Sequence, residues 1–252
     1  SVDFSDIGND ILEPLPGSIV ELPFTLWNNA TTYDAFEVCI LKSGYRSWLI
    51  ESINEGMIVE DEEGCIKPHI FEVQGLSKKE IIVLINIPEN AQSGDPGPKL
   101  TPIIKSSRSG DIVQNSSFSE LSVKMVSDLE ISDLVSKNYL SPGSENILTF
   151  NITNFGNGYD DVKFDLKNYN YEWDYWFSDG ENIVESYNLS PEYLGDNNKK
   201  IYLHILLPED VLGQKSIEFE IFINSNDFDT ELDLSDNSLS YFGSTAMVFI
   251  PE

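Results

Sequence analysis

Apolar and polar residues alternate along much of the chain, a pattern that predicts β-strands with one buried face. The alternation is clear over residues 22–26 and 36–40, and again over residues 148–152 and 162–166. Gly, Pro and Asn residues, as in Pro16-Gly17, separate these segments and predict turns. No stretch of about a dozen residues has a helical period. The expected fold class is therefore all-β, with antiparallel strands packed as β-sandwiches.

The pattern occurs twice along the chain. Residues 16–34 match residues 142–160 without gaps, with a Pro-Gly-Ser turn, an Asn and a Tyr-Asp pair at the same positions. Residues 79–89 match residues 199–209 through a strand that runs into Pro-Glu. Such an internal repeat indicates two copies of one structural unit. We therefore expect two tandem domains, residues 1–127 and 128–252, both of ordinary domain size.

In each copy, the Pro-Gly turn leads into a strand that ends in Asn, followed by a Gly/Asn loop and the Tyr-Asp pair. A Trp after the second strand is matched by Trp48 and by Trp173 or Trp176. These features resemble the extracellular immunoglobulin-like modules of the CARDB family and of the NEW family, which is found beside a carbohydrate-binding module of glycosidases. The resemblance implies two tandem immunoglobulin-like sandwiches from a surface-layer protein, an adhesin or a secreted hydrolase of a prokaryote, archaea included. It supplies no catalytic residues.

The chain is strongly acidic, with 43 Asp and Glu residues against 15 Lys and Arg and a formal net charge of -28. Such a surface repels phosphates, which excludes nucleic acid as a partner. It suits saline or extracellular surroundings, so we expect a location outside the cell or on its surface. No run of about 18 apolar residues is present, so we expect no membrane insertion of this segment. Residues 249–252 read as a strand that enters a linker, which suggests neighbouring domains in a longer chain.

The two cysteines, Cys39 and Cys65, both lie in the first copy. Cys39 aligns with Asp165 and falls on the polar face of its predicted strand. A disulfide between the two would staple an insertion, residues 51–64, across the outside of the sandwich and would stabilise the fold by about 3–4 kcal/mol. The alternative is two free thiols in a reducing compartment. The expected extracellular location favours the disulfide.

The run from Tyr169 to Phe177 is the most unusual stretch of the sequence. Every second residue at its start is aromatic, namely Tyr169, Tyr171, Trp173 and Tyr175. A strand here would present a row of rings on one face, and exposed rings stack on sugars or on partner proteins. The alternative is that one Trp fills the core and the Tyr side chains only cover a sheet. This row is the candidate ligand-binding surface.

Acidic and amide residues cluster at two places that offer oxygen ligands for Ca²⁺, the one cofactor considered. The first group is Asn157, Asp160 and Asp161, and the second is Asp227, Asp229, Asp233 and Asp236. Neither group has the spacing of an EF-hand loop. Neighbouring carboxylates are expected in so acidic a chain, which is the alternative explanation.

Four Asn-x-Ser/Thr sequons are candidates for glycosylation, at Asn29, Asn115, Asn151 and Asn188. The pattern is short, and a chain rich in Asn and Ser also produces it by chance. Asn151 falls on the expected solvent face of its strand, which permits modification.

Residues for catalysis are scarce. The chain has two histidines, His69 and His204, and His204 is expected to point outward from its strand. No Gly-x-Ser-x-Gly elbow and no His-x-x-x-His or Cys-x-x-Cys ligand pair occurs. The sequence therefore predicts a protein that is not an enzyme, but a structural or adhesive module that contacts other cell-surface proteins. The alternative is a carbohydrate-binding accessory module of a secreted hydrolase, with a polysaccharide as partner and the aromatic row as its site.

Overall fold

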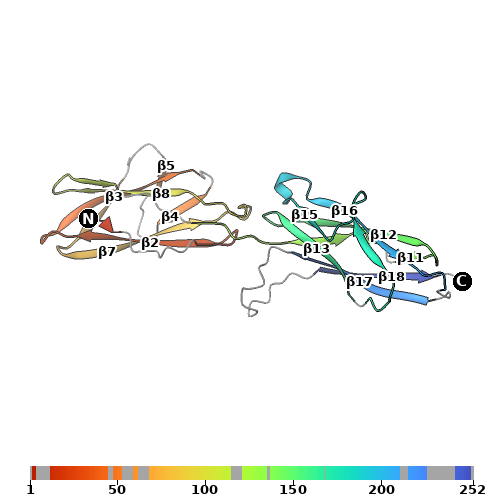
Figure 1. Ribbon diagram of the computed structural model, residues 1–252. Coiled ribbons are helices and arrows are strands. Elements are labelled where there is room, and N and C mark those ends of the chain that lie inside the picture. Colours follow the sequence, from red (N-terminus) through yellow and green to blue (C-terminus); the bar gives the residue numbers. More distant parts are fainter. Residues whose placement is uncertain are drawn as a thin grey trace. The chain divides into compact units, whose positions relative to one another are not determined.

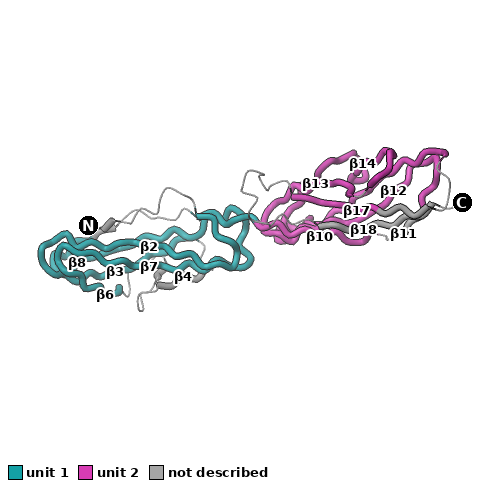
Figure 2. Tube along the Cα trace, turned by 90° about the horizontal axis from the view of Figure 1, so that it is seen from below, with its two compact units in different colours: residues 1–125 teal, residues 126–252 magenta. Residues whose placement is uncertain are grey.

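The computed structural model describes residues 2–3, 12–44, 48–52, 59–61, 68–114, 121–134, 137–167, 169–210, 215–225 and 242–250. The described residues form β-strands joined by turns, with a 3₁₀ turn at Glu192–Leu194 and no α-helix among them (Figure 1). The predicted all-β fold class is thus confirmed. The chain divides into two compact units, Ser1–Met125 and Val126–Glu252, coloured separately in Figure 2. This division lies close to the boundary expected after residue 127.

Unit 1 contains two sheets. The first has the strand order β1-β2-β7-β4, and the second has the order β5-β3-β8-β9, with β6 also paired to β3. The bounds are β1 Val2–Asp3, β2 Ile19–Asn28, β3 Asp34–Ser43, β4 Leu49–Ser52, β5 Val59–Asp61, β6 His69–Val73, β7 Ser77–Asn86, β8 Lys99–Ser106 and β9 Ile112–Gln114. The pairings are antiparallel as predicted, except that β5 runs parallel to β3.

Unit 2 also contains two sheets, with the orders β10-β12-β16-β14 and β11-β18-β17-β13-β15. The bounds are β10 Leu129–Ser132, β11 Lys137–Tyr139, β12 Glu145–Asn154, β13 Asp160–Lys167, β14 Tyr175–Ser178, β15 Ser186–Leu189, β16 Asn198–Leu206, β17 Lys215–Ser225 and β18 Phe242–Ile250. Here β11 runs parallel to β18, and the other pairings are antiparallel.

Each unit buries the apolar faces that the alternation predicts. The core of unit 1 includes the alternating residues of β2 and β3 together with Trp48. The core of unit 2 includes the matched residues of β12 and β13, of which Phe164 alone is half-buried. Burial of these side chains stabilises the fold by about 25 cal/mol per Å² of apolar surface.

A buried asparagine closes the loop between β2 and β3 in unit 1. The Asn28 side chain is 3% exposed. Its Nδ2 donates to the carbonyls of Thr32, at 3.0 Å, and Val73, at 2.9 Å, and its Oδ1 accepts from the amide of Ala30 at 3.1 Å. Because both ends of the amide are used, this side chain fixes the loop against β6.

Unit 2 repeats this arrangement with equivalent partners. Asn154 is fully buried. Its Nδ2 donates to the carbonyls of Gly158, at 3.0 Å, and Leu189, at 3.3 Å, and its Oδ1 accepts from the amide of Gly156 at 2.8 Å. The repeat read from the sequence therefore extends to individual hydrogen bonds.

The Pro-Gly turns are repeated too. Gly17 and Gly143 have positive φ angles of 75° and 69°, a backbone conformation that residues other than glycine rarely adopt. The amide of Gly17 donates to the carbonyl of Pro88 at 3.2 Å, and that of Gly143 donates to the carbonyl of Pro208 at 3.2 Å. In each copy, the Pro-Gly turn therefore contacts the end of the strand that runs into Pro-Glu.

Candidate functional site

The aromatic run lies at the edge of unit 2 but does not form the predicted strand. Residues 169–174 are not in a strand, and β14 begins only at Tyr175. Tyr169, Tyr171 and Trp173 are half-buried and pack against the core of unit 2. The expected row of rings on an open sheet face is therefore wrong, because three of the rings gain apolar burial by turning toward the core.

Two of these rings form a stacked pair. The centroids of Tyr171 and Trp173 are 4.5 Å apart, with an interplanar angle of 17°. The residues between and beside them, Asn170, Glu172 and Asp174, are exposed. A half-buried aromatic pair flanked by exposed amide and carboxylate groups has the chemistry that stacks on a sugar ring and hydrogen-bonds its hydroxyls.

Trp173 also has a structural equivalent in unit 1. The pairings of β4 with β7 and of β14 with β16 place Trp48 and Trp173 at equivalent positions. Trp48 is 3% exposed and lies in the core, whereas Trp173 is half-buried. This favours Trp173, rather than Trp176, as the Trp shared by the two copies.

Tyr169 connects the aromatic run to the core. Its hydroxyl donates to the carbonyl of Trp173 at 3.3 Å, and its ring lies 5.9 Å from that of Phe219. Burial raises the pKa of Tyr169 from 10.0 to about 12. The neighbouring Tyr175 donates its hydroxyl to Asp165 Oδ1 at 3.2 Å, and burial raises its pKa as well.

Two residues of the first calcium group, Asn157 and Asp160, accept hydrogen bonds from a neighbouring segment of the chain. Residues 126–128, which we call the entry segment, precede β10. The amide of Val126 donates to Asn157 Oδ1 at 2.7 Å, and the hydroxyl of Ser127 donates to the fully buried Asp160. Asp161 is half-buried. One side-chain oxygen each of Asn157 and Asp160 is therefore used by the protein itself.

No group of three or more His, Cys, Asp or Glu side chains suited to a metal ion occurs in the part of the chain that the structure describes. Asp227, Asp229, Asp233 and Asp236 lie outside the described residues.

The entry segment also requires Gly156. A Cβ atom on Gly156 would lie 2.4 Å from the carbonyl oxygen of Val126, closer than real contacts allow. The backbone of this loop completes the contact, because the amide of Phe155 donates to the carbonyl of Asp128 at 2.7 Å. At the position of Gly156, unit 1 has Ala30.

Cys39 differs from its expected environment. It faces away from the core side chains of β3, as predicted, but it is 0% exposed, so its face of the strand is covered. The described residues contain no free cysteine thiol. Cys65 lies outside the described residues, so the disulfide stays a prediction.

The sequons have different environments. Asn29 and Asn188 are exposed, whereas Asn151 is half-buried and donates to Asp133 Oδ2 at 2.6 Å. Asn115 lies outside the described residues. Of the described sequons, Asn29 and Asn188 are thus the accessible ones.

Sequence reasoning missed a hydrogen-bonded row across the outer face of β12, β16 and β14. His204 points away from the core, as predicted, and its Nδ1 lies 2.5 Å from Glu145 Oε1. Its Nε2 lies 2.8 Å from Ser178 Oγ. The Trp176 ring stacks on the imidazole with a centroid distance of 5.1 Å and an interplanar angle of 8°. Residues from three strands meet here through sheet register, which no local sequence motif records.

These are the residue types of an acyl-transfer triad, but the surroundings differ from those of an active site. Ser178 is only 8% exposed. The amides of Asp179 and Val184 donate to the carbonyls of Asn182 and Phe177, at 3.1 Å and 3.0 Å, so neither is directed at an oxyanion. The row is better explained as a polar cross-link between neighbouring strands.

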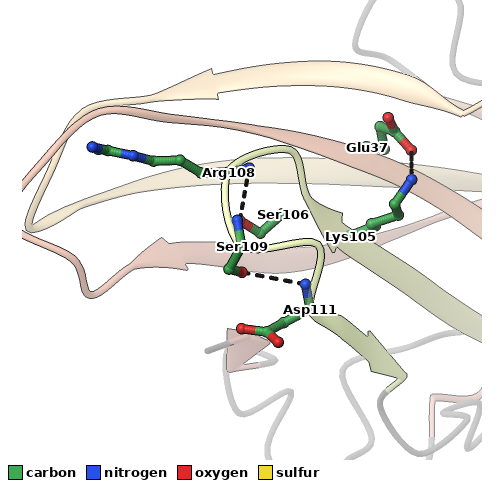
Figure 3. A network of polar contacts seen from close by, with 6 residues as sticks. All are labelled: Glu37, Lys105, Ser106, Arg108, Ser109 and Asp111. Carbon is green, nitrogen blue, oxygen red and sulfur yellow. Dashed lines mark hydrogen bonds and ion pairs between the residues drawn. The ribbon is translucent and has the colours of Figure 1, made fainter.

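A second feature missed from sequence is the serine-rich turn between β8 and β9 (Figure 3). Ser106 Oγ accepts from the amides of Arg108, at 3.3 Å, and Ser109, at 3.1 Å, and donates to Asp34 Oδ2 at 2.5 Å. These bonds shape the turn so that the side chain of Arg108 extends away from the Lys105–Glu37 ion pair (Figure 3).

Beside this turn lies an open pocket of about 420 Å³. It is lined by Thr32, Tyr33, Asp34, Ala35, Ser107 and Arg108. Its volume is in the range of small-ligand sites.

No family model matches the sequence, and no curated protein matches it. A solved protein of unknown function from Porphyromonas gingivalis W83 is similar over 94% of this chain and 94% of its own, with 11% identity and a TM-score of 0.32. The secreted serine protease VesC from Vibrio cholerae matches over 84% of this chain and 47% of its own, with 13% identity and a TM-score of 0.32. The class 5 fimbriae chaperone CfaA matches over 97% and 98%, with 14% identity and a TM-score of 0.27. At such low values these similarities carry no argument about function. The described residues contain no helix with the length and apolarity needed to span a membrane.

Proposed function

We propose that this chain is a non-catalytic structural or adhesive module of a prokaryotic cell-surface or secreted protein. The observation behind the proposal is what the two units have in common. Asn28 and Asn154 have equivalent partners, and so do the turns at Gly17 and Gly143. These repeated contacts fix loops within a unit and contain no reactive group. The hydrogen-bonded row of Glu145, His204 and Ser178 occurs in unit 2 and is not one of the repeated contacts. Two such sandwiches in series suit spacing or display.

Two further features support a location outside the cell. The net charge of -28 gives an acidic surface. The resemblance to CARDB and NEW modules is to extracellular domains.

Mild proteolysis of intact source cells tests the location. We expect the chain to be cleaved, or released into the supernatant, without lysis of the cells. A cytoplasmic protein that stays uncleaved in the same sample is the control for intact cells. Protection of the chain until the cells are lysed would contradict the proposal.

A carbohydrate-binding accessory module is the second candidate, favoured by the stacked Tyr171–Trp173 pair. A thermal melt with a panel of soluble polysaccharides separates the two candidates. A polysaccharide at about a hundredfold its Kd would stabilise the chain by about 2.7 kcal/mol and raise Tm by several degrees. Under the leading proposal no polysaccharide raises Tm. A rise that is lost in Trp173→Phe, but kept in the control Trp27→Phe of unit 1, would favour the second candidate.

A further inference from the structure

Arg108 is held against one wall of the pocket in unit 1. Its Nη1 donates to Thr32 Oγ1 and, at 3.3 Å, to the carbonyl of Tyr33. Both partners lie in the loop that Asn28 fixes, so the guanidinium plane has a defined position. An arginine held in this way loses little side-chain freedom when it binds a ligand.

The opposite edge of this guanidinium is unused. Nε and Nη2 of Arg108 make no hydrogen bond to any residue that the structure describes. These two groups point in the same direction and match the two oxygens of a carboxylate. The edge is therefore suited to bidentate binding of an acidic group.

No described carboxylate forms an ion pair with Arg108, although the chain has 43 Asp and Glu residues. Lys105, on the same hairpin, pairs with Glu37 at 3.2 Å (Figure 3). The one acid that lines the pocket, Asp34, is buried and accepts hydrogen bonds from the amide of Ala35, at 2.8 Å, and from Ser106. Among the residues that the structure describes, the charge of Arg108 is thus not balanced by a carboxylate.

The equivalent loop of unit 2 shows what kind of occupant this end of a sandwich accepts. It holds a segment of its own chain, the entry segment, through hydrogen bonds of Phe155, Asn157 and Asp160. Unit 1 cannot hold a peptide in the same position, because the methyl group of Ala30 takes the place that Gly156 leaves open for a carbonyl oxygen. An occupant of unit 1 must therefore lie further toward Arg108.

We propose that the pocket at Arg108 binds an extended acidic peptide of a partner protein. An Asp or Glu carboxylate of the peptide accepts from Nε and Nη2 of Arg108, and the ring of Tyr33, which is 43% exposed, contacts the adjoining peptide atoms. The inference rests on the proposed adhesive function, to which it adds the class of partner.

Fluorescence anisotropy with a labelled peptide of alternating Glu and Ser tests the inference on the full chain. The titration is done at about 0.15 M salt, where the Debye length of about 8 Å screens repulsion from distant carboxylates. We expect saturable binding that Arg108→Gln weakens about tenfold or more, because a charged hydrogen-bonded pair is lost. Arg108→Lys should also weaken it, because the ammonium group lacks the fork.

Lys105→Gln is the matched control, because it removes the same charge from the same hairpin outside the pocket, and it should change Kd less than about twofold. Ser107→Glu leaves the bonds of Arg108 in place and supplies a competing carboxylate, so it too should weaken binding. A thermal melt of each variant shows whether it folds.

Equal binding of the peptide in which Gln replaces Glu, or equal weakening by Lys105→Gln, would overturn the inference. So would binding of an oligogalacturonate at Arg108 in place of the peptide, since the partner would then be a sugar. Failure of this binding leaves the cell-surface proposal intact, because proteolysis of intact cells measures location independently.

Discussion

The hydroxyl of Ser127 donates to the buried side chain of Asp160, and this bond ties the entry segment to the start of β13. In unit 1 the matched carboxylate, Asp34, accepts instead from Ser106 of β8. The two units therefore use the same acid with serines from different parts of the chain. Asp160 serves to join the polypeptide to unit 2, which is a structural role.

Ser127→Ala should destabilise unit 2 by about 1–3 kcal/mol, because a buried oxygen of Asp160 loses its hydrogen-bond donor. Hydrogen exchange read by mass spectrometry resolves the two units and should show faster exchange in residues 126–160. Ser106→Ala is the control and should act on unit 1 alone. Equal effects of both variants on both units would contradict this role.

Gly156→Ala should destabilise unit 2 by about 2–3 kcal/mol, because its Cβ would overlap the Val126 carbonyl oxygen. The reverse change at the matched position, Ala30→Gly, should cost unit 1 only about 0.5–1 kcal/mol, since it mainly adds freedom to the unfolded chain. Urea unfolding of both variants measures the difference. Similar losses would mean that the entry segment moves readily away from Gly156.

Ser178 should not react with a fluorophosphonate probe, because the residue is buried and the nearby amides of Asp179 and Val184 already donate to backbone carbonyls. His204→Gln should instead lower the free energy of unfolding by about 1–3 kcal/mol, through loss of its bonds to Glu145 and Ser178. Labelling of Ser178 that disappears in His204→Gln would contradict the structural role and indicate a nucleophile.

Tyr169 should make unfolding easier in alkaline solution. Its pKa is raised by burial to about 12, whereas the unfolded chain has the ordinary value of 10.0. Between these values the unfolded chain releases the proton first, so the stabilisation present below pH 10 is lost as the pH rises toward 12. Urea unfolding at several alkaline pH values measures the slope. Tyr169→Phe should flatten it, and an unchanged slope would mean that other groups cause it.

The Cys39–Cys65 disulfide predicts that the unreduced, denatured chain has no thiol that reacts with Ellman's reagent. Reduction should destabilise the fold by about 3–4 kcal/mol in the chain-entropy model. The double variant Cys39→Ala, Cys65→Ala is the control and should not respond to reductant. Two reactive thiols in the unreduced chain would make the prediction wrong.

The core could be predicted from the sequence because its signal is local. Leu22, Phe24 and Leu26 alternate with polar residues and are all buried, and the matched residues of β12 behave alike. The same alternation gave a wrong prediction for residues 169–174, which precede β14 and do not form a strand. There the alternation of Tyr169, Tyr171 and Trp173 reflects packing of rings onto the core without a strand.

The polar sites could not be predicted because they depend on register between strands. Glu145, His204 and Ser178 lie on three strands, and no local sequence pattern around any of them predicts its contacts with the other two. Arg108 gave a weak signal as one of two arginines in an acidic chain, but its pocket depends on how the turn at Ser106 folds.

The difference between Gly156 and Ala30 means that the two copies are not interchangeable in sequence order. If a rearranged gene placed unit 1 second, the segment before it would meet the methyl group of Ala30, where unit 2 has Gly156 and no side chain. A gene that repeated unit 2 would keep a glycine at every joint and so could be lengthened copy by copy. The second copy, rather than the first, is therefore the one from which longer arrays of this protein could be built.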